Sequence, residues 1–325
     1  MTRTLHLGIV GCGGITQGMH LPIVANLSSV KLDFLADLEP PRQIAREFGA
    51  TALASRDLSS LPDCDILFLA TPLGAREPYI EEFGKRGAVI FTEKPFARDT
   101  VEHRRFLKLA KSMSCNYMRT TYSAVRQLEE IVRSNLFGSL RRIIFTEGGF
   151  VGSTGKGRTH YQTNKALSGG GILIERGSHA LSVLAHILSG YTWQVESANI
   201  KEQNGLDVDV SANLRAEMNQ AVDVNFDLSI IRPLKNDARF IFDHAEVRFD
   251  PVDPSSRLTV CNNDADRRLV FESDRAWARK VTQAFYLKWK KVIELTEAQD
   301  HQNSEVETSL TTTDLVEMIY RAGAR

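Results

Sequence analysis

The stretch Leu5-His6-Leu7-Gly8-Ile9-Val10-Gly11-Cys12-Gly13-Gly14-Ile15 decides the fold. Its first six residues are a short, largely apolar run that ends in glycines, which predicts a buried strand. Gly11 and Gly13 match the first two positions of the GxGxxG pattern, and Thr16 stands at the third. In that pattern the first glycine permits a tight turn and the second lets the backbone approach a pyrophosphate. The segment therefore predicts a strand, a turn and a helix over 16–27 whose N-terminus can receive phosphate.

Further apolar runs at 30–36, 65–70 and 88–91 alternate with predicted helices at 41–48, 78–85 and 99–113, the last capped by Asp99. Strands without polar alternation, separated by helices, indicate a parallel sheet covered on both faces. Asp37 follows the second strand, where the Rossmann pattern has the residue that binds the adenosine ribose. Its carboxylate would repel a 2′-phosphate, which favours NAD over NADP. Arg42 could pair with that phosphate, so NADP remains open. A turn or cap role is the plainer alternative for Asp37.

The second half of the chain follows a different pattern. Consecutive strands are predicted at 141–145, 195–200, 208–217, 221–231, 239–242, 246–249 and 268–271, with helices at 123–135, 172–188, 276–292 and 313–321. Apolar and polar residues alternate over 222–228, which is typical of an antiparallel sheet with one covered face. The fold class is therefore α/β. A Rossmann domain with a doubly wound parallel sheet (1–121) precedes a domain with a large, mostly antiparallel open sheet (122–325).

Composition excludes several classes of protein. The 40 Lys and Arg balance the 40 Asp and Glu, so no basic excess points to nucleic acid or an anionic membrane. No run approaches the roughly 20 apolar residues that span a bilayer. The apolar N-terminus leads into glycines rather than into a signal-peptide cleavage site. The 4 cysteines are scattered without CxxC spacing, so a cytoplasmic location is expected.

Glu93-Lys94-Pro95 directly follows the apolar run 88–91. Open α/β sheets bind their ligands at the carboxyl ends of the strands, which places Lys94 near the reacting end of a dinucleotide. A lysine there can orient a substrate hydroxyl and stabilise a developing alkoxide or carbonyl oxygen. The alternative is a surface salt bridge, which is the commoner role of a loop lysine.

The glycine turn, Asp37, Ala70-Thr71-Pro72 and Glu93-Lys94-Pro95-Phe96-Ala97 together resemble the Gfo/Idh/MocA family of NAD(P)-dependent sugar and inositol oxidoreductases. The resemblance continues through Asn116-Tyr117-Met118-Arg119, the glycines at 169–171, Gly177-Ser178-His179 and residues 319–321. It implies a dimer or tetramer formed through the C-terminal sheet. It also implies a cofactor, NAD or NADP, bound by Gly11, Gly13, Gly14, Ile15, Asp37, Thr71, Pro72, Glu93 and Lys94.

The predicted helix 172–188 is mainly apolar, and one narrow stripe of it holds Glu175, His179, Ser182 and His186. Histidine suits alcohol oxidation, which releases a proton to a base whose pKa is near neutrality. The family's usual catalytic set is Lys, Asp and His, with the Asp four residues before the His. The resemblance therefore implies catalysis by Lys94 and His179, with Glu175 in place of the Asp. The additional methylene moves the carboxylate by about 1.5 Å.

Two alternatives concern the same helix. His179 could be a structural core histidine. Zinc is not expected, because the order of these residues is not HExxH and no convincing third ligand is near in sequence. Substrate contacts are expected from residues near the start of the second domain and in the polar stretch 152–168. The arginines among them suit an anionic group by bidentate pairing, and surface salt bridges are the alternative. The expected residues are Arg119, Tyr122, Arg158, His160 and Tyr161.

The sequence thus predicts an oxidoreductase that moves a hydride between nicotinamide and a hydroxyl or keto carbon of a sugar, cyclitol or related polyhydroxylated substrate. One alternative is a non-catalytic dinucleotide-binding sensor or regulatory protein, which the change from Asp to Glu175 keeps open. A second is a relative that uses NAD for redox-assisted elimination or glycoside cleavage.

Overall fold

A computed structural model describes residues 3–149, 164–262, 268–272, 274–298 and 304–324. The chain divides into two compact units, and each is described by itself. The first unit combines Met1–Asn116 with Phe285–Glu307, and the second combines Tyr117–Ala284 with Thr308–Arg325. No helix among the described residues has the length and apolar character needed to cross a membrane.

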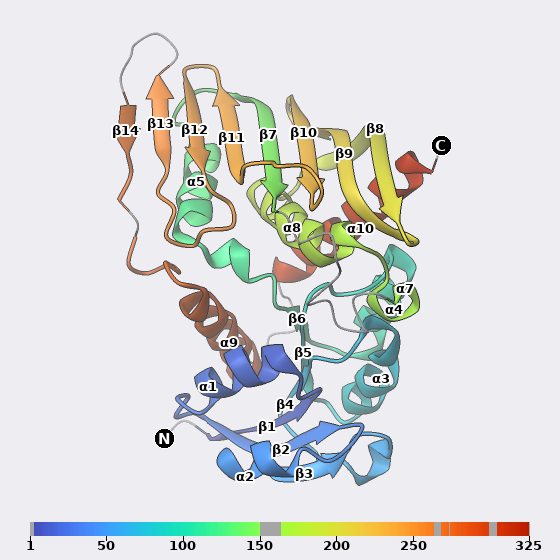
Figure 1. The fold of residues 1–325 in the computed structure, drawn as a ribbon. Coiled ribbons are helices and arrows are strands. Elements are labelled where there is room, and N and C mark those ends of the chain that lie inside the picture. The colour runs from blue at the N-terminus through green and yellow to red at the C-terminus, as the bar shows by residue number, and fades with distance from the viewer. Residues whose placement is uncertain (1–2, 150–163, 263–267, 273, 299–303, 325) are drawn as a thin grey trace. The chain divides into compact units, whose positions relative to one another are not determined.

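The first unit is built on a parallel sheet (Figure 1). Its strands are β1 (Leu5–Val10), β2 (Val30–Asp37), β3 (Thr51–Ala54), β4 (Ile66–Leu69), β5 (Val89–Thr92) and β6 (Met113–Cys115), in the order β3-β2-β1-β4-β5-β6. All the pairings are parallel. This is the strand order of a doubly wound Rossmann sheet, so the predicted fold class is confirmed.

The longer helical segments of the first 116 residues alternate with these strands. They are a π-helical turn η1 (Thr16–His20) that continues into α1 (Leu21–Val24), α2 (Arg42–Glu47), α3 (Glu77–Lys85) and α4 (Thr100–Leu109). Asp99 caps α4, since its Oδ1 accepts the N–H of Glu102 at 2.7 Å. The predicted extension of this helix to residue 113 is wrong. Ala110 is extended (φ −131°, ψ 135°), and Met113 begins the edge strand β6 instead.

A helix from the far end of the sequence completes the first unit. Helix α9 (Val281–Ala298) places Trp289, Val292 and Ile293 in the same core as buried residues of β1, β4 and β5. The sequence-based boundary at 121/122 assigned this helix to the second domain. The structure differs because the apolar face of α9 is buried against the parallel sheet rather than within the second unit.

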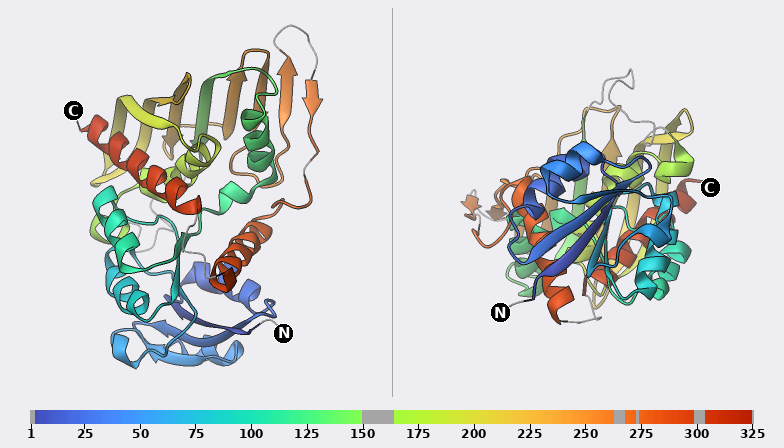
Figure 2. Two further views of the ribbon diagram at one scale, coloured as in Figure 1. Left: turned by 180° about the vertical axis from the view of Figure 1, so that it is seen from behind. Right: turned by 90° about the horizontal axis from the view of Figure 1, so that it is seen from below.

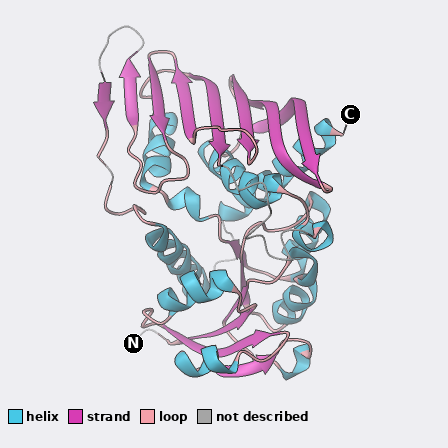
Figure 3. Ribbon diagram, viewed as in Figure 1, coloured by secondary structure: helices cyan, strands magenta, loops and turns pink. Residues whose placement is uncertain are grey.

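The second unit contains an eight-stranded sheet (Figure 3). Only the pairing of β7 with β10 is parallel among the described strands, so the predicted mostly antiparallel sheet is confirmed. The strand β13 was not predicted. The strands are β7 (Leu140–Gly148), β8 (Thr192–Gln203), β9 (Leu206–Glu217), β10 (Ala221–Ser229), β11 (Asp237–Phe242), β12 (Ala245–Phe249), β13 (Thr259–Asn262) and β14 (Arg268–Val270).

One face of this sheet is covered and the other is polar. Helices α5 (Ser123–Arg133), α8 (Ser178–Ile187) and α10 (Ser304–Gly323) lie on the covered face (Figure 2), where Val224 and Phe226 of β10 are buried. The opposite face carries a ladder of side-chain hydrogen bonds across four strands. Arg142 donates to Asn225 at 2.8 Å, Asn225 to Asn213 at 2.7 Å, and Asn213 to Ser197 at 2.9 Å.

Candidate functional site

The glycine turn is open on one side and tight on the other. Gly11 has φ +95°, and a Cβ there would lie 2.7 Å from the carbonyl carbon of Ala70, so only glycine fits. By contrast, no atom of the described residues lies within 4 Å of a Cβ built on Gly13 or Gly14. Both glycines and Ile15 are exposed. The turn therefore offers backbone that a ligand can approach closely.

Thr16 explains how the turn tolerates the missing third glycine. Its side chain is fully buried, and its Oγ1 donates a hydrogen bond to the carbonyl of Gly11 at 2.6 Å. The hydroxyl thus has a partner inside the turn, and the helix opens into the π-helical turn η1 at this residue. Such turns are frequent at functional sites.

Asp37 ends β2 beside the turn. Its Oδ2 accepts the N–H of Cys12 at 2.7 Å, and its Oδ1 accepts the N–H of Leu38 at 2.7 Å. Two backbone donors hold the half-buried carboxylate in one orientation, and each oxygen keeps a second lone pair for another donor. Burial, and then the charge of Asp37, raise the pKa of the Cys12 thiol to about 12. Cys12 is therefore a neutral packing residue and not a nucleophile.

The loops after β4 and β5 are tied together by a buried arginine. Arg76 is 1% exposed, and its guanidinium donates to the carbonyls of Thr71, at 3.2 Å, and of Pro95. Thr71 and Pro72 are half-buried. The hydroxyl of Thr71 is buried and has no hydrogen-bond partner among the described residues. Because buried polar groups are nearly always paired, this orphan hydroxyl marks a place where a polar ligand fits.

Glu93 and Lys94 directly follow β5 and differ in burial. Glu93 is buried and its Oε1 meets His20 and Asn116, whereas Lys94 is half-buried. The glycine turn, Asp37, Thr71 and Lys94 follow β1, β2, β4 and β5, so all four lie at the carboxyl edge of one parallel sheet. That edge is where Rossmann sheets bind dinucleotides, and the residues present fit one.

In the second unit, Glu175 lies in a π-helical turn η5 (Leu173–Gly177) that runs into α8 with His179. The prediction of a helix over 172–188 is confirmed in position, although its first turn is wider than an α-helix. Glu175 and His179 are half-buried. Ser182 is fully buried, and its Oγ donates to the carbonyl of His179 at 2.7 Å.

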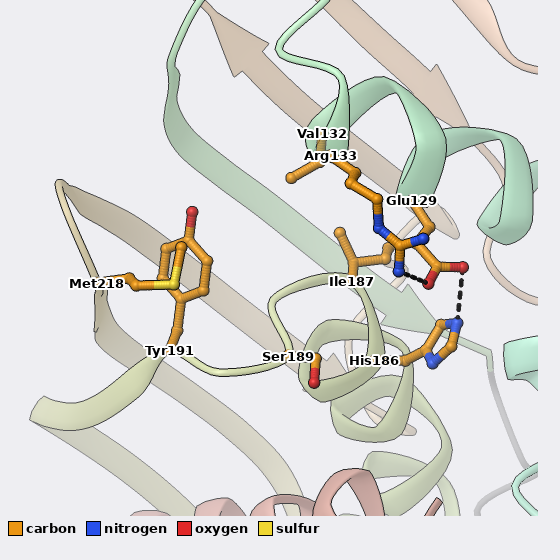
Figure 4. Close-up of a pocket in the computed structure, with 8 residues that line it drawn as sticks. All are labelled: Glu129, Val132, Arg133, His186, Ile187, Ser189, Tyr191 and Met218. Atoms are coloured by element: carbon orange, nitrogen blue, oxygen red, sulfur yellow. Dashed lines mark hydrogen bonds and ion pairs between the residues drawn. The ribbon is translucent and has the colours of Figure 1, made fainter. Parts of the chain in front are cut away.

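His186, the last member of the predicted polar stripe, belongs to a different set of contacts. Its Nε2 lies 2.6 Å from Arg126 and 3.2 Å from Glu129. It lines a pocket of about 250 Å³ beside the end of α8, which Figure 4 shows together with Met218 and Tyr191. Within the described parts of the chain, no group of three or more His, Cys, Asp or Glu side chains is arranged to hold a metal ion.

A buried carboxylate that the sequence analysis missed holds the start of the helix with Glu175 and His179. Asp207 of β9 is 2% exposed and accepts the N–H groups of Gly171 (2.6 Å) and Leu173 (2.7 Å) and the hydroxyl of Tyr320 (2.7 Å). A Cβ on Gly171 would lie 2.2 Å from the carbonyl oxygen of Asp207. The glycines at 169–171 thus allow a side chain from another strand to satisfy the helix N-terminus. The only feature of the sequence that could have indicated this role of Asp207 is its position as an acidic residue near the start of an apolar strand.

The residues expected to contact a substrate are either buried within the second unit or lie outside the described residues. Arg119 donates to both oxygens of Glu147, at 2.6 and 3.1 Å, and both side chains are buried. The charge of Arg119 is thus matched inside the unit, and its contact with an anionic substrate stays a prediction. Tyr122 is 2% exposed, and burial raises its pKa to about 12. Arg158, His160 and Tyr161 lie outside the described residues.

Comparison with known sequences gives two related enzymes. The chain is 25% identical over 220 residues to the dTDP-3,4-didehydro-2,6-dideoxy-alpha-D-glucose 3-reductase of Streptomyces violaceoruber, covering 65% of this chain and 62% of the reductase. It is 27% identical over 117 residues to the inositol 2-dehydrogenase of Rhizobium meliloti (strain 1021), covering 35% of each. The chain thus spans less than two thirds of either relative.

Solved structures match almost the whole chain. The aldose-aldose oxidoreductase from Caulobacter crescentus, complexed with glycerol, has a TM-score of 0.85 at 17% identity and covers 99% of this chain and 98% of its own. A 3-ketoreductase from Actinomadura kijaniata, in complex with NADP and TDP-benzene, has a TM-score of 0.83 at 15% identity and covers 98% of each chain. At these identities the likeness establishes the fold.

The family model of oxidoreductases with an NAD-binding Rossmann fold, GFO_IDH_MocA, matches residues 5–121. That range holds the glycine turn, Asp37, Thr71 and Lys94. The N-terminal part of the chain is therefore similar to the NAD-binding Rossmann domain of the Gfo/Idh/MocA oxidoreductases.

Proposed function

We propose that the protein is an NAD(P)-dependent oxidoreductase that acts on a hydroxyl or keto carbon of a sugar, cyclitol or related polyhydroxylated compound. The observation that carries the proposal is the position of half-buried Lys94 directly after β5, at the same sheet edge as the open glycine turn and Asp37. The reductase and dehydrogenase names of its two sequence relatives support the substrate class.

Each proposed catalytic residue has a distinct task. Bound NAD or NADP supplies hydride exchange at the nicotinamide ring. Lys94 donates a hydrogen bond to the reacting oxygen and stabilises its negative charge. His179 accepts the hydroxyl proton during oxidation and returns it during reduction, as a general base and acid. Glu175, one turn before His179, orients the imidazole or a substrate hydroxyl.

The direct test follows nicotinamide absorbance with a panel of sugars, cyclitols and keto-sugars, including dTDP-linked sugars because one relative reduces such a compound. Turnover of a member of the panel with either cofactor supports the proposal. If NAD or NADP binds but neither oxidation nor reduction occurs across the panel, the protein is a dinucleotide-binding sensor and the proposal is wrong.

Asp37 is expected to set the cofactor preference. Its fixed carboxylate beside the turn accepts hydrogen bonds from ribose hydroxyls and repels a 2′-phosphate, so the wild-type protein should bind NAD more tightly than NADP. Asp37→Asn keeps the shape but removes the charge, and should narrow the ratio of the two dissociation constants by about tenfold, or about 1.4 kcal/mol. Titration of each reduced cofactor by fluorescence measures the ratio. A wild-type preference for NADP would contradict the assignment.

We also infer a homodimer or homotetramer formed through the polar face of the C-terminal sheet, as the family resemblance implies. The ladder from Arg142 to Ser197 gives that face fixed donors and acceptors rather than an apolar surface. Light scattering on the purified protein measures the assembly. A monomeric mass at micromolar concentration would reject the proposed assembly.

We also propose a cytoplasmic location, because the cysteines are scattered without CxxC spacing. Fractionation of cells tests this location.

A further inference from the structure

Strand β9 has a β-bulge close to its start. Lys201 of β8 pairs with Asp209, whereas the next residue of β8, Glu202, pairs with Asp207. Val208 is therefore an extra residue in β9. Because side chains alternate along a strand, Asp207 and Asp209 would share one face of the sheet in a regular strand. The bulge lets Asp207 turn to the other face.

The contacts of the two aspartates show that they lie on opposite faces of the sheet. Asp209 accepts a hydrogen bond from Arg232 at 2.7 Å, and Arg232 also donates to Ser211 at 3.1 Å. Ser211 alternates onto the same polar face as Asn213, a member of the ladder described above. Asp207 instead meets the start of a helix on the covered face. Bulges are often found next to active sites, where they redirect a side chain in this way.

Three donors from two other elements bind the Asp207 carboxylate. Its Oδ1 accepts the N–H of Gly171 at 2.6 Å and the hydroxyl of Tyr320, on α10, at 2.7 Å, and its Oδ2 accepts the N–H of Leu173 at 2.7 Å. The fit is close, because a Cβ on Gly170 would lie 2.3 Å from the Tyr320 hydroxyl. Burial, and then the charge of Asp207, raise the pKa of Tyr320, so its hydroxyl remains a donor. We call Asp207 and Tyr320 the clamp.

The helix backbone joins the clamp to the two proposed site residues of the second unit. The N–H of Glu175 donates to the carbonyl of Gly171 at 3.0 Å, and Gly171 is the residue whose own N–H the clamp holds. Gly177 and Ser178 have helical φ values of −59° and −60°, so the π-helical turn continues into α8 without a break. A shift of the first turn is therefore transmitted to His179.

A clamp from another strand does more than an ordinary helix cap. A cap residue within the helix's own sequence would satisfy the same N–H groups but would move together with the helix. Asp207 belongs to the sheet, so it fixes the helix relative to the sheet. We propose that Asp207 and Tyr320 are positioning residues, which hold Glu175 and His179 in place for the reaction. The inference rests on the tasks proposed above for Glu175 and His179.

The first test measures the surroundings of His179 without any turnover. Diethyl pyrocarbonate acylates accessible neutral imidazoles, and peptide mass spectrometry gives the rate at each histidine. Asp207→Asn replaces one acceptor oxygen by an NH2 group, so a donor loses its partner. The first turn should then open more often, and His179 should react about fivefold faster. His186, held by Arg126 and Glu129, should keep its rate. If His179 in folded Asp207→Asn protein reacts at the wild-type rate, the proposal is overturned.

A second variant covers the case in which Asp207→Asn does not fold. Tyr320→Phe removes one hydroxyl and keeps the ring, so His179 should again react faster, by less than in Asp207→Asn. An unchanged rate in Tyr320→Phe would reject the role of Tyr320. The two changes should be less than additive when combined, because both act on one hydrogen bond.

The matched control is Asp209→Asn. It makes the same change on the same strand to a carboxylate that is 4% exposed, but it breaks contacts on the opposite face of the sheet. This variant should unfold at a lower urea concentration and keep the wild-type rate at His179. If His179 reacted as fast in Asp209→Asn as in Asp207→Asn, the effect would be a general loosening of the unit, and the proposal would be wrong.

Kinetics then separate this inference from the proposed function. With an active substrate, Asp207→Asn should lower kcat by about tenfold or more, while the dissociation constant of NAD changes by less than about twofold. A purely structural role would lower the amount of folded enzyme but not its kcat. If no substrate is turned over, the proposed function fails, while the rates at His179 still decide the role of the clamp. If His179 is required for turnover but folded Asp207→Asn keeps the wild-type kcat, the function stands and this inference fails.

Discussion

Lys94→Ala and His179→Ala should each lower kcat by about 10²–10⁴-fold while the dissociation constant of NAD changes by less than about threefold. In the proposed mechanism, the first variant removes the group that stabilises charge on the reacting oxygen, and the second removes the proton acceptor. Both side chains are half-buried rather than part of the fully buried core, so folding should be retained. Steady-state rates from nicotinamide absorbance and cofactor titration by fluorescence measure the two quantities separately.

The same helix supplies a matched control for His179. His186 lies seven residues further along, is also half-buried, and is held by Arg126 and Glu129 beside the pocket of Figure 4. His186→Ala should leave kcat within about twofold of the wild-type value. A large loss in His186→Ala with little loss in His179→Ala would move the acid–base role to the other histidine.

The Rossmann half was predictable because its decisive features are local. Strands β1, β4 and β5 are short, largely apolar runs, which is typical of strands that a parallel sheet buries on both faces. Short elements were missed where the sequence has no local feature that marks their boundaries. Residues 110–112 follow α4 without a glycine or proline, so nothing in the sequence separates the helix from the strand β6.

The candidate site also has a part that was predictable from the sequence and a part that was not. Gly11 and Asp37 act through backbone turns and strand ends next to them in sequence, so their positions were evident from the pattern. His20 and Glu93 are 73 residues apart, and His20 and Trp289 are 269 apart. Asp207 and Gly171 are separated by 36. Contacts at such separations depend on how whole elements pack, and no periodicity in one sequence encodes them.

Trp289→Ala is expected to destabilise the protein more than any other truncation considered, by about 3–5 kcal/mol. The side chain is fully buried among Phe68, Phe91 and His20, with ring centroids 5.4, 4.9 and 5.9 Å from its own. Truncation would leave a cavity on the face of the sheet that α9 covers and an unpaired Nδ1 on His20, which adds the cost of a buried acceptor.

Urea denaturation followed by circular dichroism measures the difference, and Trp193→Ala is the control because that side chain is only half-buried. The control should lose much less stability than Trp289→Ala. The comparison also tests where the first unit ends. If Trp289→Ala and Trp193→Ala were equally stable, α9 would not contribute to the cofactor-binding unit, and residues 1–121 would suffice for it. A large and specific loss means that the part of the chain matched by the family model is completed by a helix about 160 residues beyond its end, since α9 begins at Val281.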